Sequence, residues 1–377
     1  MRLLYILFSL LFIVSCNSNN TNLKTDGSKS LEYATGIKIN ECDNYVHITI
    51  NDPWNEAKVL ATYILIDKNE EIPENLPSGV IIKTPIEKVI VYNSPQCNAL
   101  DYLGVISTVK GVCEPEYITN EYIRNGVDLG EIVNLGMASS PDIEKIIDLN
   151  PELIIAPGFQ NNSYSVLSKT GIPIIQCVDY MEQYPLGNSE WIKLYGLLFD
   201  KTSIADSIFN SLSFNYNKLK DIASQYEYKP RLLTERRYNN VWYLPGNNSF
   251  AANLYRDAGA ELAINDNNLT GSLSLSTEEV LDKAGDADIW LIKYYGEKEM
   301  TYEDLKNDYF LYSHFDAWKN RNIYICNTLY QSYYETLPLH PDIILKDLIK
   351  IFHPEVMIDF PDIFEHEVNT FFRHMSK

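Results

Sequence analysis

The chain has 377 residues, and its 51 acidic and 31 basic side chains give a formal net charge of −20 at pH 7. This charge argues against a nucleic-acid partner, because binding to a phosphate backbone requires a basic surface. Apolar residues make up 45% of the chain and aromatic residues 12%, which argues against intrinsic disorder. The length suffices for one bilobal protein with two packed cores.

Residues 1–16, MRLLYILFSLLFIVSC, have the pattern of a targeting segment. Arg2 supplies the positive charge, and the apolar run after it is shorter than the ~20 residues of a membrane-spanning helix. The ending IVSC resembles a lipobox, whose cysteine, here Cys16, receives a lipid; a signal peptide cut nearby is the alternative. Residues 17–30 are polar and typical of a flexible tether. We expect an exported protein that faces the periplasm and contacts a bacterial membrane only through its lipid.

Five cysteines follow the lipobox, and they are widely spread. An odd number at such spacing does not form a disulfide framework, and the absence of a C-x-x-C pair argues against a zinc site. Cys97 and Cys113 could pair in an oxidising compartment; two buried free thiols are the alternative. The other three are Cys42, Cys177 and Cys326.

Residues 31–82 contain short alternating stretches such as YVHITIN and VLATYILI, separated by turn-rich breaks. This pattern predicts a small antiparallel β meander. Beyond it, strands alternate with helices, which predicts a parallel sheet covered on both faces. The predicted strands of this first lobe are 88–92, 105–112, 152–156 and 173–178, and its predicted helices are 97–104 and 141–149.

Residues 189–226 are predicted to be helical. The later part carries an apolar stripe at steps of three and four, formed by Ile204, Ile208, Leu212, Tyr216, Leu219 and Ala223. At 1.5 Å per residue it would form a rod of roughly 36 Å that ends before Pro230. Such a rod can connect two lobes while packing on both.

After the rod the alternation of strands and helices resumes, so the chain reads as lobe, rod and lobe. Predicted strands are 231–235, 241–245, 288–293 and 322–327, and predicted helices are 250–259, 276–284, 301–307 and 341–352. The expected boundaries are a signal peptide at 1–16, a tether at 17–30, the meander at 31–82, a first α/β lobe at 83–188, a helical linker at 189–229, a second α/β lobe at 230–356 and a C-terminal extension at 357–377.

This layout resembles the cobalamin- and iron-siderophore-binding proteins of bacterial ABC importers over roughly residues 85–355. Five phrases carry the resemblance, in the family's order: PIEKVIVYN, SPDIEKIIDLNPELIIAPG, YLPGNNSFAANLYRDAGAE, LSTEEVLDKAGDADIWLI and HPDIILKDLIKIFHPE. It implies an α/β protein with two Rossmann-like lobes joined by one long helix, here with an extra N-terminal β meander. It also implies a monomer without cofactor or enzymatic activity that delivers a small molecule to a membrane permease.

In this family one glutamate on each lobe forms salt bridges to the permease. By motif, these residues are Glu144 and Glu278, with Glu279 as the competing choice for the second position. Two acids held apart on a rigid frame can recognise a partner with two-fold symmetry and fix the position in which it docks. The alternative is that each acid only stabilises the first turn of its helix through the macrodipole.

The ligand is expected outside the carboxyl ends of the strands. The loops there are rich in aromatic residues, which suit a large flat or amphipathic ligand. Arg236 and Arg237 match the oxygen atoms of anionic ferric siderophores, so an iron chelate is placed ahead of a corrinoid. The predicted ligand-binding residues are Tyr92, Asn93, Phe159, Tyr180, Arg236, Arg237, Trp242, Tyr243, Tyr294, Tyr295, Tyr330, Tyr333 and Tyr334.

Motifs of other chemistry are missing. The sequence has no Walker loop, no GxGxxG after a strand, no HExxH and no GxSxG, and its six histidines form no pair with metal-ligand spacing. No catalytic or metal site is therefore predicted, although a tyrosine-rich site can also bind haem. The alternatives from other classes are a chelatase-like enzyme, which would need a histidine or cysteine cluster, and a surface adhesin or sensor lipoprotein.

Overall fold

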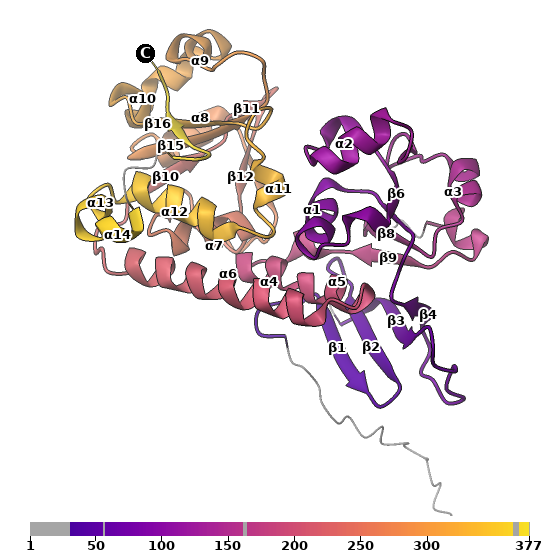
Figure 1. Ribbon diagram of the computed structural model, residues 1–377. Coiled ribbons are helices and arrows are strands. Elements are labelled where there is room, and N and C mark those ends of the chain that lie inside the picture. The colour runs from indigo at the N-terminus through magenta and orange to yellow at the C-terminus, as the bar shows by residue number, and fades with distance from the viewer. Residues whose placement is uncertain (1–30, 56, 161–163, 365–368, 377) are drawn as a thin grey trace, which may run out of the picture.

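The computed structural model describes residues 31–55, 57–160, 164–364 and 369–376. The predicted signal peptide, Cys16 and the tether lie outside these residues. Figure 1 shows two lobes side by side along a long helix, with a separate N-terminal sheet below the first lobe. In the described part of the chain, no helix combines the length and apolarity needed to cross a membrane.

The N-terminal sheet has the strand order β1-β2-β3-β4. Strands β1 (Ile37–Cys42), β2 (Tyr45–Asn51) and β3 (Val59–Asp67) pair antiparallel, but β4 (Val80–Thr84) is parallel to β3. The predicted antiparallel meander holds for β1 to β3 and is wrong at β4, because the long connection at 68–79 carries the chain back to the level of Tyr63, from which β4 runs in the same direction as β3. One face of the sheet shares a hydrophobic core with the first lobe.

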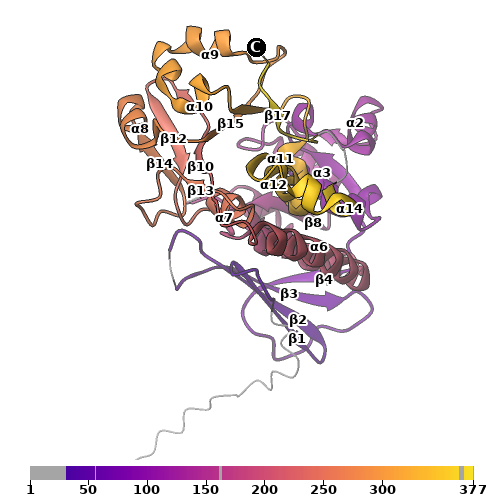
Figure 2. The same ribbon diagram turned by 90° about the vertical axis from the view of Figure 1, so that its left-hand side faces the viewer.

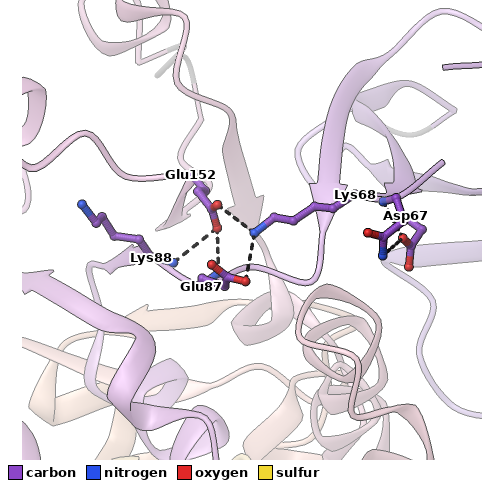
Figure 3. A network of polar contacts seen from close by, with 6 residues as sticks. Asp67, Lys68, Glu87, Lys88 and Glu152 are labelled. Atoms are coloured by element: carbon purple, nitrogen blue, oxygen red, sulfur yellow. Dashed lines mark hydrogen bonds and ion pairs between the residues drawn. The ribbon is translucent and has the colours of Figure 1, made fainter. Parts of the chain in front are cut away.

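Polar contacts fix this sheet to the first lobe. Figure 3 shows Lys68, just after β3, with its ammonium 2.8 Å from the Glu152 carboxylate and 3.7 Å from that of Glu87. Glu152 also accepts the backbone N–H of Glu87 at 2.6 Å. In addition, the buried Tyr63 hydroxyl donates to the Ile174 carbonyl at 2.9 Å and accepts from the backbone N–H of residue 176 at 3.0 Å. Tyr63 thereby satisfies backbone groups of β9 (Ile174–Cys177), which is an edge strand of the sheet in the first lobe.

The first lobe is a five-stranded parallel sheet in the order β7-β6-β5-β8-β9. The predicted strand at 105–112 begins with a short 3-10 turn, and the two-residue β7 was not predicted. Its elements are β5 (Val89–Val91), α1 (Ser94–Tyr102), β6 (Val109–Val112), α2 (Glu121–Asp128), β7 (Val133–Asn134), α3 (Ile143–Leu149), β8 (Leu153–Pro157) and β9 (Ile174–Cys177).

Three helices connect the lobes: α4 (Pro185–Glu190), α5 (Ile192–Leu198) and the 22-residue α6 (Thr202–Ala223). The first half of α6 packs into the core of the first lobe, and its second half packs into the core of the second lobe. This confirms the long helix between the lobes. Ile204 is 43% exposed, so its assignment to the apolar stripe is wrong; the stripe begins at Ala205 instead.

The second lobe has a mixed sheet in the order β13-β10-β15-β16-β17, of which only β17 runs antiparallel, and a separate antiparallel sheet β11-β12-β14. The strand predicted at 241–245 lies in this second sheet. The C-terminal extension supplies β17. The elements are β10 (Arg231–Thr234), β11 (Arg237–Tyr238), β12 (Val241–Pro245), α7 (Phe250–Asp257), β13 (Glu261–Leu262), β14 (Ser272–Leu275), α8 (Thr277–Ala284), β15 (Ile289–Tyr294), α9 (Tyr302–Asp308), α10 (Asp316–Lys319), β16 (Ile323–Asn327), α11 (Tyr333–Thr336), α12 (Pro341–Phe352), α13 (Val356–Asp359), α14 (Pro361–Phe364) and β17 (Arg373–His374).

Candidate functional site

A cavity of about 670 Å³ lies where three parts of the chain meet. Its walls come from residues 180–183 after β9, from the second lobe around Lys293 and Tyr333, and from residues 51–53 of the N-terminal sheet. This volume is within the range of small-molecule sites, and the cavity contains residues from the carboxyl ends of β9 and β15, where ligands of parallel sheets bind. A second hollow, a groove of about 720 Å³, lies between β3, β4 and the edge strand β9 and is not placed between the two lobes.

A charged lysine forms part of the cavity wall. Lys293, near the end of β15, forms an ion pair with Glu235, the residue after the neighbouring strand β10. Its ammonium also donates to the Tyr255 hydroxyl at 3.3 Å and lies 5.7 Å from the Tyr333 ring centre. Burial alone would lower the pKa of Lys293, but the Glu235 carboxylate raises it well above its usual value. The lysine is therefore a fixed cation in the cavity wall.

The backbone that presents this pair is strained. Glu235 has φ 60°, a left-handed conformation that a non-glycine residue adopts at a cost of about 1–3 kcal/mol. The turn directs the carboxylate back towards β15, where it meets Lys293. Such strain persists only where the surrounding structure enforces it and is concentrated at functional sites.

Of the predicted aromatic residues, Tyr180, Tyr333 and Tyr334 line the cavity. The Tyr180 hydroxyl donates to the Gly158 carbonyl at 2.6 Å, which fixes the ring while leaving 47% of the residue exposed. Tyr333 and Tyr334 meet edge to face, with ring centres 5.2 Å apart. These rings offer apolar surface together with phenolic hydrogen-bonding groups.

Three predicted ligand residues are buried in cores and are not among the residues that line the cavity. Trp242 is 0% exposed; it packs against Trp290 and donates its indole N–H to the Thr234 carbonyl at 2.9 Å. Tyr92 and Tyr294 are 2% and 8% exposed. All three rings pack in the hydrophobic cores of their lobes.

Two arginines that were expected to bind an anionic ligand are engaged elsewhere. Arg236 forms an ion pair with Asp308 at 3.2 Å, and the Arg237 guanidinium lies 3.8 Å from the Tyr309 ring centre while donating to the Asp308 carbonyl at 3.1 Å. Neither is among the residues lining the cavity, and the same holds for the predicted residues Asn93, Phe159, Tyr243, Tyr295 and Tyr330.

The lobes are joined across the cleft by a buried carboxylate. Glu335 of α11 in the second lobe accepts hydrogen bonds from the hydroxyls of Ser94 and Thr119 in the first lobe, and from the Thr119 backbone N–H at 3.0 Å. Asn253 of α7 adds a hydrogen bond of 2.8 Å to the carbonyl of residue 183. The described conformation is thus closed by specific contacts between the lobes.

Sequence reasoning did not select Lys293, Glu235, Tyr255 or Glu335 as site residues. A signal for the first two exists, because each is the charged last residue of a predicted strand. Tyr255 lies within α7 and Glu335 within the short helix α11, and no local pattern marks either of them. All five cysteines among the described residues are free, so Cys97 and Cys113 are buried thiols.

Asp179 is a buried acid next to the cavity residues. Its carboxylate accepts a hydrogen bond from the Gln96 side chain at 3.1 Å. Burial raises the pKa of Asp179 to about 6, and the nearby charge of Glu182 adds to the rise, while hydrogen bonds oppose it. The native state therefore binds a proton more tightly than the unfolded chain, whose aspartate has a pKa of about 3.9.

We expect Asp179→Asn to stabilise the protein more at pH 7.5 than at pH 5. A raised native pKa makes the wild type lose stability as pH rises from about 4 to 6, and the penalty persists above that range. The neutral amide avoids it. Urea unfolding at both pH values measures the effect, with the exposed Asp148→Asn as control. Equal changes at both pH values would contradict the buried-acid account.

The predicted docking acids are exposed, one on each lobe. Glu144 lies in the first turn of α3, and Glu278 in that of α8, where it accepts the Tyr309 hydroxyl at 3.0 Å. The competing residue Glu279 is held in a capping box with Ser276. The geometry thus leaves Glu278 as the available acid of this pair. Among the described residues, no cluster of His, Cys, Asp or Glu side chains could hold a metal ion.

Two α/β lobes on one long helix, with a tyrosine-lined cavity between them, define a bilobal solute-binding protein. The family model described as periplasmic binding protein matches residues 89–328, and the chain belongs to this family. The family resemblance is therefore confirmed. Because the matched family is one of periplasmic binding proteins, the chelatase-like enzyme is set aside.

Relatives agree with this assignment. The chain is 27% identical over 370 residues to an uncharacterized lipoprotein of Methanocaldococcus jannaschii, covering 90% of this chain and 87% of the relative. It is 26% identical over 180 residues to the petrobactin-binding protein YclQ of Bacillus subtilis, covering 47% of this chain and 51% of that protein.

Solved structures share the fold. A possible iron-binding periplasmic solute-binding protein from Staphylococcus epidermidis gives a TM-score of 0.57 at 19% identity and covers 72% of this chain and 100% of its own. The siderophore-binding protein FhuD from Vibrio cholerae, bound to Fe3+–Desferal, gives 0.53 at 16% identity and covers 71% and 100%. At such low sequence identities these structures support the fold, but they do not identify the ligand.

Proposed function

We propose that the chain is the solute-binding subunit of an ABC importer and carries an iron chelate of the siderophore class in the cavity between its lobes. The single observation that supports this most is Lys293, a charged ammonium in a wall built from tyrosines. The metal-binding groups of siderophores are oxygen-rich and often anionic, so they accept hydrogen bonds from an ammonium and from phenols. The name of the petrobactin-binding relative supports the same class.

Intrinsic tryptophan fluorescence tests this proposal directly. Trp54 follows the cavity residue Pro53 and is partly exposed, so it provides a local reporter. The chain without its signal peptide is titrated with ferric Desferal, ferric petrobactin, haem and cobalamin. We expect saturable quenching by a ferric chelate at micromolar concentration or below. If only haem or cobalamin quenched the fluorescence, that compound would be the ligand in place of a ferric chelate. If none of the four compounds quenched it, the proposal that the protein binds a solute would be overturned.

We infer further that the protein is anchored through Cys16 and docks on a permease through Glu144 and Glu278. Support comes from the motifs, from the exposure of both acids and from the lipoprotein relative. Because the chain is monomeric in this scheme, one molecule presents both acids, and rim charges of this kind govern encounter and register.

Reversing both charges, Glu144→Lys with Glu278→Lys, should reduce uptake of a ferric chelate at least tenfold, because the basic groups of the permease that pair with the glutamates would then face lysines. Ligand affinity should stay unchanged, since neither acid lines the cavity. Uptake of radioactive iron by cells measures the first effect, and the titration above measures the second.

The matched control is Glu121→Lys with Glu303→Lys, which reverses an exposed first-turn acid on each lobe outside the predicted motifs. Equal loss of uptake in both pairs would show that net charge matters and that the particular positions do not.

A further inference from the structure

The segment that leads into the N-terminal sheet is held by a fully buried carboxylate. Glu190 is 0% exposed and accepts three consecutive backbone N–H groups, those of residues 32, 33 and 34, at 3.0, 2.8 and 2.9 Å. Lys193 balances its charge at 2.6 Å. Because Glu190 is the last residue of α4, the segment is fixed to the helices that connect the lobes.

A second buried carboxylate extends this attachment. Glu182 accepts hydrogen bonds from the backbone and hydroxyl of Thr35, from the Gly36 backbone N–H at 2.8 Å and from the Trp191 indole N–H at 3.0 Å. Glu182 belongs to residues 180–183, which themselves form part of the cavity wall. The attachment point of the sheet and the ligand cavity therefore share the same short segment.

The turn after β2 is hydrogen-bonded to the segment that Glu182 holds. Asn51 donates its backbone N–H to the Gly36 carbonyl and its side-chain amide to the Thr35 carbonyl, each at 2.8 Å. The Asp52 carboxylate then accepts the backbone N–H groups of Trp54 at 2.9 Å and Asn55 at 3.1 Å. The conformation of the turn is thus set by hydrogen bonds that begin at Thr35 and Gly36, the residues held by Glu182.

This turn reaches the cavity. Asn51, Asp52 and Pro53 line it together with Phe250 at the start of α7 and with Lys293. Figure 2 shows the turn between β2 and β3 rising from the sheet towards α7. The family match begins only at residue 89, so this wall lies outside the part of the chain that defines the family.

We propose that the N-terminal sheet is a third wall of the ligand site, whose Asn51–Pro53 turn selects the ligand by size through Pro53 and by charge through Asp52. The inference rests on the proposed function, because it assumes that the cavity is occupied by the transported solute. With Lys293 in one wall and Asp52 in another, the cavity suits a chelate that carries a cationic or hydrogen-bond-donating arm beside its anionic metal-binding groups.

The test is the replacement Pro53→Trp, measured by calorimetric titration with ferric Desferal, ferric petrobactin and haem. The larger ring enters the cavity, so affinity should fall at least about tenfold for the probe that binds the wild type. The control is Asn44→Trp, which places the same ring at the exposed turn between β1 and β2, at the opposite end of β2. This variant should bind as the wild type does.

A second variant, Asp52→Asn, keeps an acceptor for the turn but removes its charge. It should change affinity at least threefold, upward for an anionic complex and downward for a cationic one such as ferric Desferal with its protonated amine. If both Pro53→Trp and Asp52→Asn bound the ligand with wild-type affinity, the inference that the N-terminal sheet forms a third wall of the site would be overturned. The proposed function would not be affected by that result. If the wild type binds none of the probes, the proposed function fails and the inference fails with it.

Discussion

Replacing Glu190 by alanine should lower the free energy of unfolding by about 3–5 kcal/mol, the cost of breaking a buried ion pair by removal of one partner. The change leaves the ammonium of Lys193, which is 20% exposed, without its counter-charge. It also leaves three backbone N–H groups of residues 32–34 without their acceptor. Urea unfolding followed by circular dichroism measures the loss, and limited proteolysis should show early cleavage near residues 31–36.

The matched control is Glu152→Ala in the network of Figure 3. This carboxylate also accepts backbone N–H groups and pairs with a lysine, but its side chain is 35% exposed. Water can therefore replace part of what is lost, and we expect a loss of about 1 kcal/mol. If the two variants lost equal stability, the burial of Glu190 would not be the source of its effect.

The fold was largely predictable because the signals for strands and helices are local. Buried strands appear as short apolar runs, and the stripe of α6 has helical spacing, so the order of lobe, helix and lobe could be read from the sequence. The parallel pairing of β4 was missed because pairing direction depends on where the 68–79 connection takes the chain. Local alternation does not contain that information.

The candidate site was less predictable, because residue type does not determine burial. Trp242 and Tyr243 are neighbours in β12, yet one is 0% and the other 47% exposed, since successive side chains of a strand point to opposite faces. Arg236 was expected to bind a ligand and instead pairs with Asp308, which lies far away in sequence. Glu182 and Glu190 acquire their roles from residues about 150 positions earlier, and no sequence pattern links such partners.

Replacing Lys293 by methionine should weaken binding of the ferric chelate at least about 100-fold, which corresponds to roughly 2.7 kcal/mol. Among the described residues that line the cavity, Lys293 is the only cation. Apart from this loss of affinity, breaking the ion pair should lower the stability of the protein, by about 3–5 kcal/mol for a buried pair, because the partner charge is left behind. Here that charge is Glu235, which would remain partly buried next to the empty position.

The double variant Lys293→Met with Glu235→Gln separates the two contributions. It removes both charges, so most of the stability lost in the single variant should return, because no unpaired carboxylate remains. Affinity should stay low, because the ammonium that would hydrogen-bond the chelate is still absent. Thermal unfolding and the same titration distinguish the effects. If the double variant bound as tightly as the wild type, Lys293 would serve only to balance Glu235, and the cavity would recognise its ligand through the tyrosines alone.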